Sequence, residues 1–187
     1  GVNAQGQLGD GTTTTRPIPT LVAGGHIFQQ LAVGGLHTCG LTSSGAALCW
    51  GENVDGQVGD GTTVDRPDPT PVAAPLTFQQ IVAGGSHTCA LTAAGDAHCW
   101  GSNRFGALGD GTPTARLVPT AVIGGLTFSA LASGGSHTCG ITTERDMFCW
   151  GRNHIGQLGN GSTDGATFCP VPVGTLQAFC GRAEATR

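Results

Sequence analysis

Short apolar stretches alternate with glycine-rich polar stretches along the whole chain. Residues 28–33 read Phe-Gln-Gln-Leu-Ala-Val and end at two glycines. The stretches 37–42 and 46–50 follow, and they are separated by Ser43-Ser44-Gly45, a three-residue hairpin loop in which Gly45 takes the left-handed position. This alternation predicts short antiparallel strands joined by tight turns.

The same pattern recurs every fifty residues. A segment rich in Gly, Asp and Thr begins at Gly1, Trp50, Trp100 and Trp150, and an apolar segment begins at Phe28, Phe78 and Phe128. The X-Pro pairs of 66–72 favour extended backbone at the edge of a sheet, because Pro donates no hydrogen bond to a neighbouring strand. Each repeat therefore supplies about four short strands, which is one blade of a β-propeller.

The predicted fold class is all-β, a partial propeller of four-stranded antiparallel blades. At fifty residues per blade, 187 residues make about 3.7 blades, whereas closed propellers have about 4–8. We expect tandem repeats over 1–173, with boundaries near 50, 100 and 150, and an atypical C-terminal end or linker over 174–187. An open arc leaves two apolar edges unpaired, so we expect it to belong to a longer chain or to be completed by other subunits.

Six of the eight cysteines form three pairs ten residues apart. When the hairpin is folded about Ser44, Cys39 faces Cys49 at a distance that a disulfide can span. The predicted disulfides are Cys39–Cys49, Cys89–Cys99, Cys139–Cys149 and Cys169–Cys180. Four disulfides indicate an oxidising compartment, either extracellular, periplasmic or at the cell surface.

Two metal interpretations compete with this assignment. His37, Cys39 and Cys49 are three candidate zinc ligands, but zinc sites usually contain more closely spaced cysteine pairs. Asp55 and Asp60 resemble part of a calcium loop, but a calcium cage needs more acidic ligands than two, and Asx turns explain them. We therefore expect neither a metal nor a cofactor.

Charge and hydropathy exclude further classes. The net charge is −4, every basic residue is Arg, and these residues are scattered, so the chain lacks the clustered cations of a nucleic-acid surface. Its apolar runs fall short of the roughly 20 residues of a membrane span. The repeat also contains no acid, base and nucleophile cluster that breaks the pattern, so we do not expect an enzyme. Glu144-Arg145-Asp146 does break it, but a charged turn is more often solubilising.

The motifs WGxNxxGQLGDGT, RPxPTxV and GGSHTCAL occur in that order, and the set resembles the regulator of chromosome condensation repeat. Members of that family form β-propellers, typically seven-bladed. The His-Thr-Cys and Cys-Trp-Gly pairing resembles the secreted bacterial branch with disulfides. The resemblance implies a range of activities, from nucleotide exchange on a nuclear GTPase to inhibition of β-lactamase by loops on one face. The disulfides and the absence of a basic tail favour the second kind.

Variation between the copies indicates a binding surface. The scaffold residues barely change, yet the pair after the WGxN motif reads Ala4-Gln5, Val54-Asp55, Arg104-Phe105 and His154-Ile155. Equivalent positions in successive blades share one rim of a propeller. An exposed Phe and Ile beside Arg and His are typical of a recognition surface. The predicted binding residues are Arg104, Phe105, His154, Ile155, Val54 and Asp55.

Two functions follow from these observations. The first is a non-catalytic extracellular scaffold that binds another protein or a surface glycan through the loops on one rim. The alternative is a structural subunit that assembles edge to edge with further copies of itself into a filament or surface layer.

Overall fold

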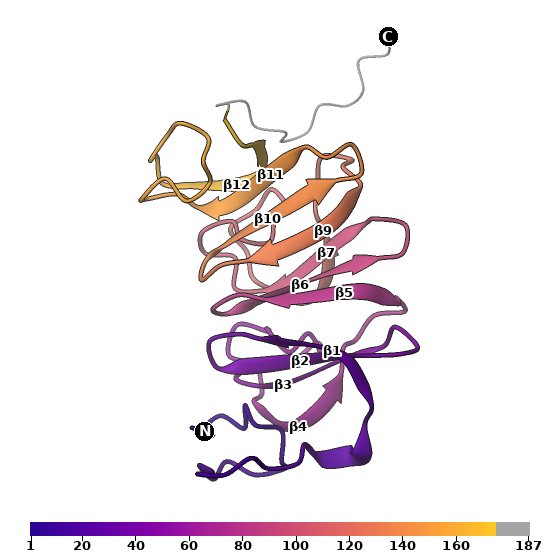
Figure 1. The fold of residues 1–187 in the computed structure, drawn as a ribbon. Coiled ribbons are helices and arrows are strands. Elements are labelled where there is room, and N and C mark those ends of the chain that lie inside the picture. Colours follow the sequence, from indigo (N-terminus) through magenta and orange to yellow (C-terminus); the bar gives the residue numbers. More distant parts are fainter. Residues whose placement is uncertain (175–187) are drawn as a thin grey trace.

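The computed structural model describes residues 1–174, which form three four-stranded antiparallel sheets in a row (Figure 1). The first sheet contains β1 (Phe28–Val33), β2 (His37–Thr42), β3 (Ala47–Gly51) and β4 (Arg66–Pro71). The second contains β5 (Phe78–Ala83), β6 (His87–Thr92), β7 (Ala97–Gly101) and β8 (Arg116–Ala121). The third contains β9 (Phe128–Ser133), β10 (His137–Thr142), β11 (Met147–Arg152) and β12 (Ala166–Pro172).

The strands in each sheet follow chain order, and the described residues add one short 3-10 turn, η1 (Ala23–Gly25). This arrangement confirms the all-β fold and the blade of four short strands. We call the three sheets blades 1, 2 and 3. Residues 174–187, predicted to be an atypical end or linker, lie outside the described residues except for Gly174.

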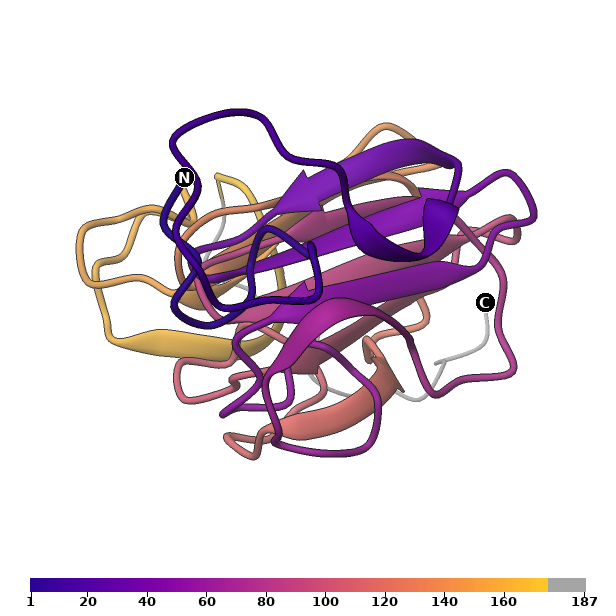
Figure 2. The same ribbon diagram turned by 90° about the horizontal axis from the view of Figure 1, so that it is seen from below.

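The blades pack face to face, as the view along the stack shows (Figure 2). β5 of blade 2 contacts β1 and β2, and β9 of blade 3 contacts β5 and β6. The apolar core therefore lies between the blades. Its first cluster joins Cys39 and Leu41 of blade 1 to Phe78, Ile81 and Trp100 of blade 2. The repeat cannot bury these side chains by itself, so stacking is what stabilises each blade.

Each blade contains one disulfide across its central hairpin. The bonds are Cys39–Cys49, Cys89–Cys99 and Cys139–Cys149, with Cα atoms 4.0, 4.1 and 4.0 Å apart. Each pair is directly opposed in the strand register, as the folded hairpin predicts. Cys180 lies outside the described residues, so its pairing with the buried Cys169 stays a prediction.

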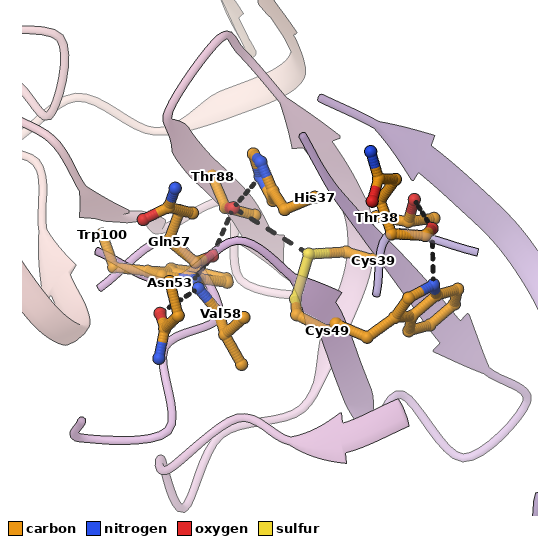
Figure 3. The surroundings of a disulfide bond; sticks show 11 residues. His37, Thr38, Cys39, Cys49, Asn53, Gln57, Val58, Thr88 and Trp100 are labelled. Carbon is orange, nitrogen blue, oxygen red and sulfur yellow. Dashed lines mark hydrogen bonds between the residues drawn. A yellow bond between two sulfur atoms is a disulfide. The ribbon is translucent and has the colours of Figure 1, made fainter. Parts of the chain in front are cut away.

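A hydrogen-bond node joins each blade to the next (Figure 3). Between blades 1 and 2, His37 Nε2 and Thr88 Oγ1 are 2.9 Å apart. Thr88 Oγ1 donates to Gln57 O at 2.9 Å, and Trp100 Nε1 donates to the same carbonyl at 3.0 Å. Gln57 lies in the loop that joins β3 to β4, which we call a connecting loop. Its backbone carbonyl thus binds two side chains of the next blade.

The node recurs between blades 2 and 3. His87 Nε2 lies 2.9 Å from Thr138 Oγ1, and both Thr138 Oγ1 and Trp150 Nε1 lie 2.9 Å from Ala107 O. The repeated histidine therefore bonds a threonine hydroxyl of the next blade. Because this partner lies 51 residues away in the chain, no local sequence pattern identifies it.

Each connecting loop is held by an internal polar frame. Asn53 is fully buried, and its side chain accepts from Val58 N at 2.9 Å and donates to Asp60 Oδ1 at 3.1 Å. Asp60 also caps the turn at Thr62 and accepts from Arg66 Nε at 2.6 Å. The bond from Thr62 N to Asp60 Oδ1 is an Asx turn, as the sequence predicts for Asp60, whereas Asp55 donates its backbone amide to Gln57 Oε1.

Part of the outer face of blade 1 is covered by the N-terminal segment, because Gln7 O accepts hydrogen bonds from Thr38 Oγ1 at 3.0 Å and from Trp50 Nε1 at 3.1 Å. Within residues 1–174, the rest of this face and the outer face of blade 3 carry exposed apolar side chains. Leu31 is 58% exposed, whereas its equivalent in blade 2, Ile81, is 1% exposed. On blade 3, Met147 is 48% exposed, whereas Ala47 of blade 1 is 7% exposed. The predicted open edges are thus present in the described part of the chain.

The buried histidines predict acid sensitivity. Burial lowers the pKa of His87 from 6.5 to about 3, with smaller effects from His37 and His137, and burial lowers that of His37 to about 4. The unfolded chain therefore binds more protons below pH 6.5, and stability falls with the pH. From pH 7 to pH 5 we expect a loss of about 2 kcal/mol per buried histidine. Urea unfolding of wild type and His87→Gln measures this, and equal pH dependence of the two would contradict it.

Two loop glycines provide a matched test of the loop packing. Gly59 and Gly61 have φ angles of 79° and 84°, which cost a non-glycine residue about 1 kcal/mol. A Cβ at Gly59 would lie 2.5 Å from Trp100 Nε1, whereas at Gly61 the nearest atom is 3.9 Å away. We expect Gly61→Ala to lower the unfolding free energy by about 1 kcal/mol, and Gly59→Ala to lower it by about 3 kcal/mol or more. Equal losses in denaturant titrations would show that the loop does not rest on the indole ring.

Candidate functional site

We number the equivalent loops by repeat: the first lies within residues 1–16, and the second, third and fourth are residues 52–65, 102–115 and 153–165. The third loop carries two of the predicted binding residues, Arg104 and Phe105, at its tip. Asn103 is buried, accepts from Leu108 N at 3.0 Å and donates to Asp110 Oδ1 at 2.8 Å. Gly106 N donates to Asn103 O at 2.9 Å and closes a tight turn. Residues 104 and 105 are the central residues of this turn, so their side chains project away from the frame.

Phe105 lies between two guanidinium groups. Arg104 Cζ is 5.5 Å from the centroid of the Phe105 ring, and Arg152 Cζ is 5.2 Å from it. The His154 ring meets the same ring edge-on, with centroids 5.9 Å apart. Cation–π contacts of this kind hold an aromatic ring while the cationic groups stay hydrated. We call Arg104, Phe105, Arg152 and His154 the rim cluster.

The structure brings together three of the six predicted residues. Arg104 and Phe105 come from the loop between β7 and β8 of blade 2, and His154 comes from the equivalent loop between β11 and β12 of blade 3. Ile155 follows His154 on the same turn and is 85% exposed.

The other two predicted residues lie on the preceding loop. Val54 is 61% exposed, and Asp55 uses its backbone amide to bond Gln57 Oε1 at 2.9 Å. No ring or charge contact recorded for the described residues joins either of them to the rim cluster. The six residues therefore do not form one continuous cluster.

Sequence reasoning missed Arg152. Arg152 lies inside the WGxN motif, at its variable position, and is not one of the two variable residues that follow the motif. Glu52 and Ser102 occupy the equivalent positions, so the change of charge was visible in the sequence.

A cavity of about 180 Å³ lies beside the cluster, where the third loop meets blades 2 and 3. Its lining residues are Ser86, His87, Ser102, Arg104, Phe105, Ala107, Gly135 and Ser136. Ala107 stands where the other copies have Gln7, Gln57 and Gln157. Because Gln57 is fully buried, the shorter Ala107 leaves space at the same place in the third loop.

The second loop carries the opposite charge. Glu52, Asp55 and Asp65 lie close enough together that burial, followed by the charges of Asp65 and Asp55, raises the pKa of Glu52. Gln57 Nε2 donates to Glu52 Oε2 at 3.0 Å. Adjacent loops of one rim therefore present an acidic segment and a basic aromatic segment.

Within residues 1–174 no three His, Cys, Asp or Glu side chains lie close enough to hold a metal ion. No helix in that part of the chain is long and apolar enough to cross a membrane.

Comparison with known families matches the described blades. The regulator of chromosome condensation (RCC1) repeat matches residues 1–41, 44–91, 94–141 and 146–183. A second model of the same repeat matches 28–57, 78–107 and 128–157. The chain belongs to the RCC1 repeat family. No curated protein matches it over its sequence.

Solved structures of RCC1-like propellers resemble this chain in fold. Human WBSCR16 superposes with a TM-score of 0.78 at 23% identity, over 91% of this chain and 45% of that protein. Prp20p of Saccharomyces cerevisiae, described with its binding to Gsp1p and histones, gives 0.69 at 23% identity, over 80% and 39%. The ectodomain of the Physcomitrella patens receptor kinase CR4 gives 0.52 at 27% identity, over 72% and 32%. The chain thus spans less than half the length of each of these structures.

Among these neighbours, yeast Prp20p is described with its binding to Gsp1p and histones and in a complex with Kap60. Each RCC1 repeat here pairs a nearly constant frame, Asn103 to Asp110 in the third copy, with a variable turn. The frame therefore holds the turn in place whatever side chains the turn carries.

The frame of the third loop can be tested at Asp110. Burial raises its pKa, but the hydrogen bonds from Arg116, Thr112 and Asn103 together lower the pKa below its ordinary value, and Arg116 Nε lies 2.7 Å from Oδ2. Asp110→Asn removes the charge pair, and we expect the unfolding free energy to fall by about 1 kcal/mol. Asp68→Asn, on an exposed position of β4, is the matched control and should change it little. Equal effects in urea titrations would mean that the ion pair does not support the loop.

Proposed function

We propose that this chain is an extracellular scaffold that binds another protein through the rim cluster and the loops beside it. The observation that carries the proposal is the pairing of a nearly constant loop frame with a variable tip. Arg104 and Phe105 come from one loop, and Arg152 and His154 come from the end of β11 and the loop after it, yet the four side chains meet in one cluster. Aromatic and Arg side chains are the residue types most enriched at binding hot spots.

Two observations support an extracellular location. Three disulfides lie within 1–174, and disulfides of this kind persist in oxidising compartments. The CR4 ectodomain is a structural neighbour from outside the cell. The His-Thr-Cys motif contains both a disulfide cysteine and the histidine of the node. The disulfide and the contact between blades therefore lie in the same segment of the chain.

Edge-to-edge assembly is the second candidate function, and the exposed apolar side chains on the outer faces of blades 1 and 3 favour it. Leu31 on one face and Ile141 and Met147 on the other are 58%, 40% and 48% exposed. However, the outer face of blade 3 lacks a residue that blades 1 and 2 use to bond the next blade. Gln30 and Gln80 each make two hydrogen bonds to the next blade, and the equivalent residue on blade 3 is Ala130. This difference favours the rim over the blade edge as the binding surface.

A peptide library displayed on phage and selected on the non-reduced protein tests the rim proposal. We expect selected peptides to lose at least about tenfold in affinity against Phe105→Ala, because truncation of a central aromatic residue typically costs more than about 1.4 kcal/mol. Gln5→Ala, at the equivalent position of the first loop, is the matched control and should leave their affinity unchanged.

Two outcomes would overturn the proposal. Peptides that bind both variants equally would place the binding surface elsewhere. Light scattering that shows growing oligomers, abolished by Met147→Asp, would instead support edge-to-edge assembly.

A further inference from the structure

The third loop differs from the other copies at positions that meet in space. In the second loop, Gln57 fills the space under the turn and donates to Glu52. In the third loop Ala107 and Ser102 occupy these two positions, which removes a buried amide and a carboxylate together. The space that they leave is the cavity of about 180 Å³.

The same change frees a backbone donor. In the first, second and fourth loops the amides of Gln5, Asp55 and Ile155 donate to the glutamine side chain two residues later, at 3.1, 2.9 and 3.1 Å. Phe105 is the equivalent residue of the third loop, and Ala107 offers its amide no such acceptor. By analogy with these loops, the Phe105 amide faces the space that the glutamine occupies elsewhere.

The remaining walls of the cavity also carry donors. Ser86, Ser102, Ser136 and Arg104 belong to its lining, and their hydroxyl and guanidinium groups are hydrogen-bond donors. No lining residue is acidic, and Arg152 Cζ lies 5.2 Å from the centroid of the Phe105 ring. Converging amide, hydroxyl and guanidinium donors without a carboxylate are the chemistry of an oxyanion site.

We propose that this cavity binds the side-chain carboxylate of an acidic residue on the protein partner. The inference rests on the proposed function and specifies the partner's chemistry. Arg104 supplies the positive charge, the serines and the Phe105 amide supply further donors, and the Phe105 ring packs on the apolar part of the acidic side chain. The acidic second loop, with Glu52, repels the same ligand, so the partner is directed to the third loop.

Small ligands test the cavity without any partner. Amide-proton NMR of the oxidised protein would be recorded with N-acetyl-glutamate α-amide and with its neutral analogue, N-acetyl-glutamine α-amide. We expect the carboxylate to shift the Phe105 amide resonance saturably, and the neutral analogue to leave it unchanged. Arg104→Ala should weaken the carboxylate at least about tenfold.

Two variants distinguish the effect of the cavity volume from the effect of the charges around it. Ala107→Gln restores the side chain of the other loops and should abolish the shift while the fold is retained. Gln57→Ala opens the equivalent space beside Glu52 and Asp55, and we expect it to gain no carboxylate binding there.

Three results would overturn the proposal. These are an equal response to the neutral analogue, an undiminished response in Ala107→Gln, and a response to inorganic phosphate alone, which would indicate a phosphate site. If the cavity fails this test while selected peptides still require Phe105, the rim function stands and only the carboxylate assignment is wrong.

Discussion

One backbone carbonyl in each of the first three loops, at Gln7, Gln57 and Ala107, holds the structure together. Gln57 O accepts from Thr88 of the next blade and from the indole of Trp100, and Thr88 in turn contacts His37 of the blade before. The loop, the disulfide hairpin and the apolar face of two blades are thereby fixed at a single point (Figure 3). Unpaired polar groups at this depth would cost several kcal/mol, so the node constrains all of these residues together.

The node also explains how the site arises without damage to the fold. Because the acceptor is a backbone atom, the side chain at that position is free to change. Ala107 keeps the hydrogen bonds of Gln57 to Thr and Trp at 2.9 Å, yet it opens a cavity. Asn103 likewise holds the turn through its own side chain, so the hydrogen bonds of the frame do not use the side chains of Arg104 and Phe105. The side chains at the tip can therefore differ between loops, because the stability of each loop depends on the backbone carbonyl and on the buried Asn side chain.

Much of the fold could be predicted from the sequence, because the period and the hairpins are local. The ten-residue spacing of Cys39 and Cys49 predicts their register, and the alternation over 28–33 predicts β1. The contact between His37 and Thr88 could not be predicted, since it joins residues fifty-one positions apart. In the site, copy-to-copy comparison found Phe105. It did not find Ala107, which lies two residues beyond the variable pair, although the third of the four copies is the one that lacks the glutamine.

Hydrogen exchange of the three indole N–H groups tests the node most directly. We expect the Trp150 indole to be protected to within a few-fold of the Trp100 indole, because both are buried and donate to equivalent loop carbonyls, Ala107 O and Gln57 O, despite the change of side chain. Exchange of the Trp150 indole that is faster by orders of magnitude would contradict this expectation, because the third loop would then not be held on blade 3.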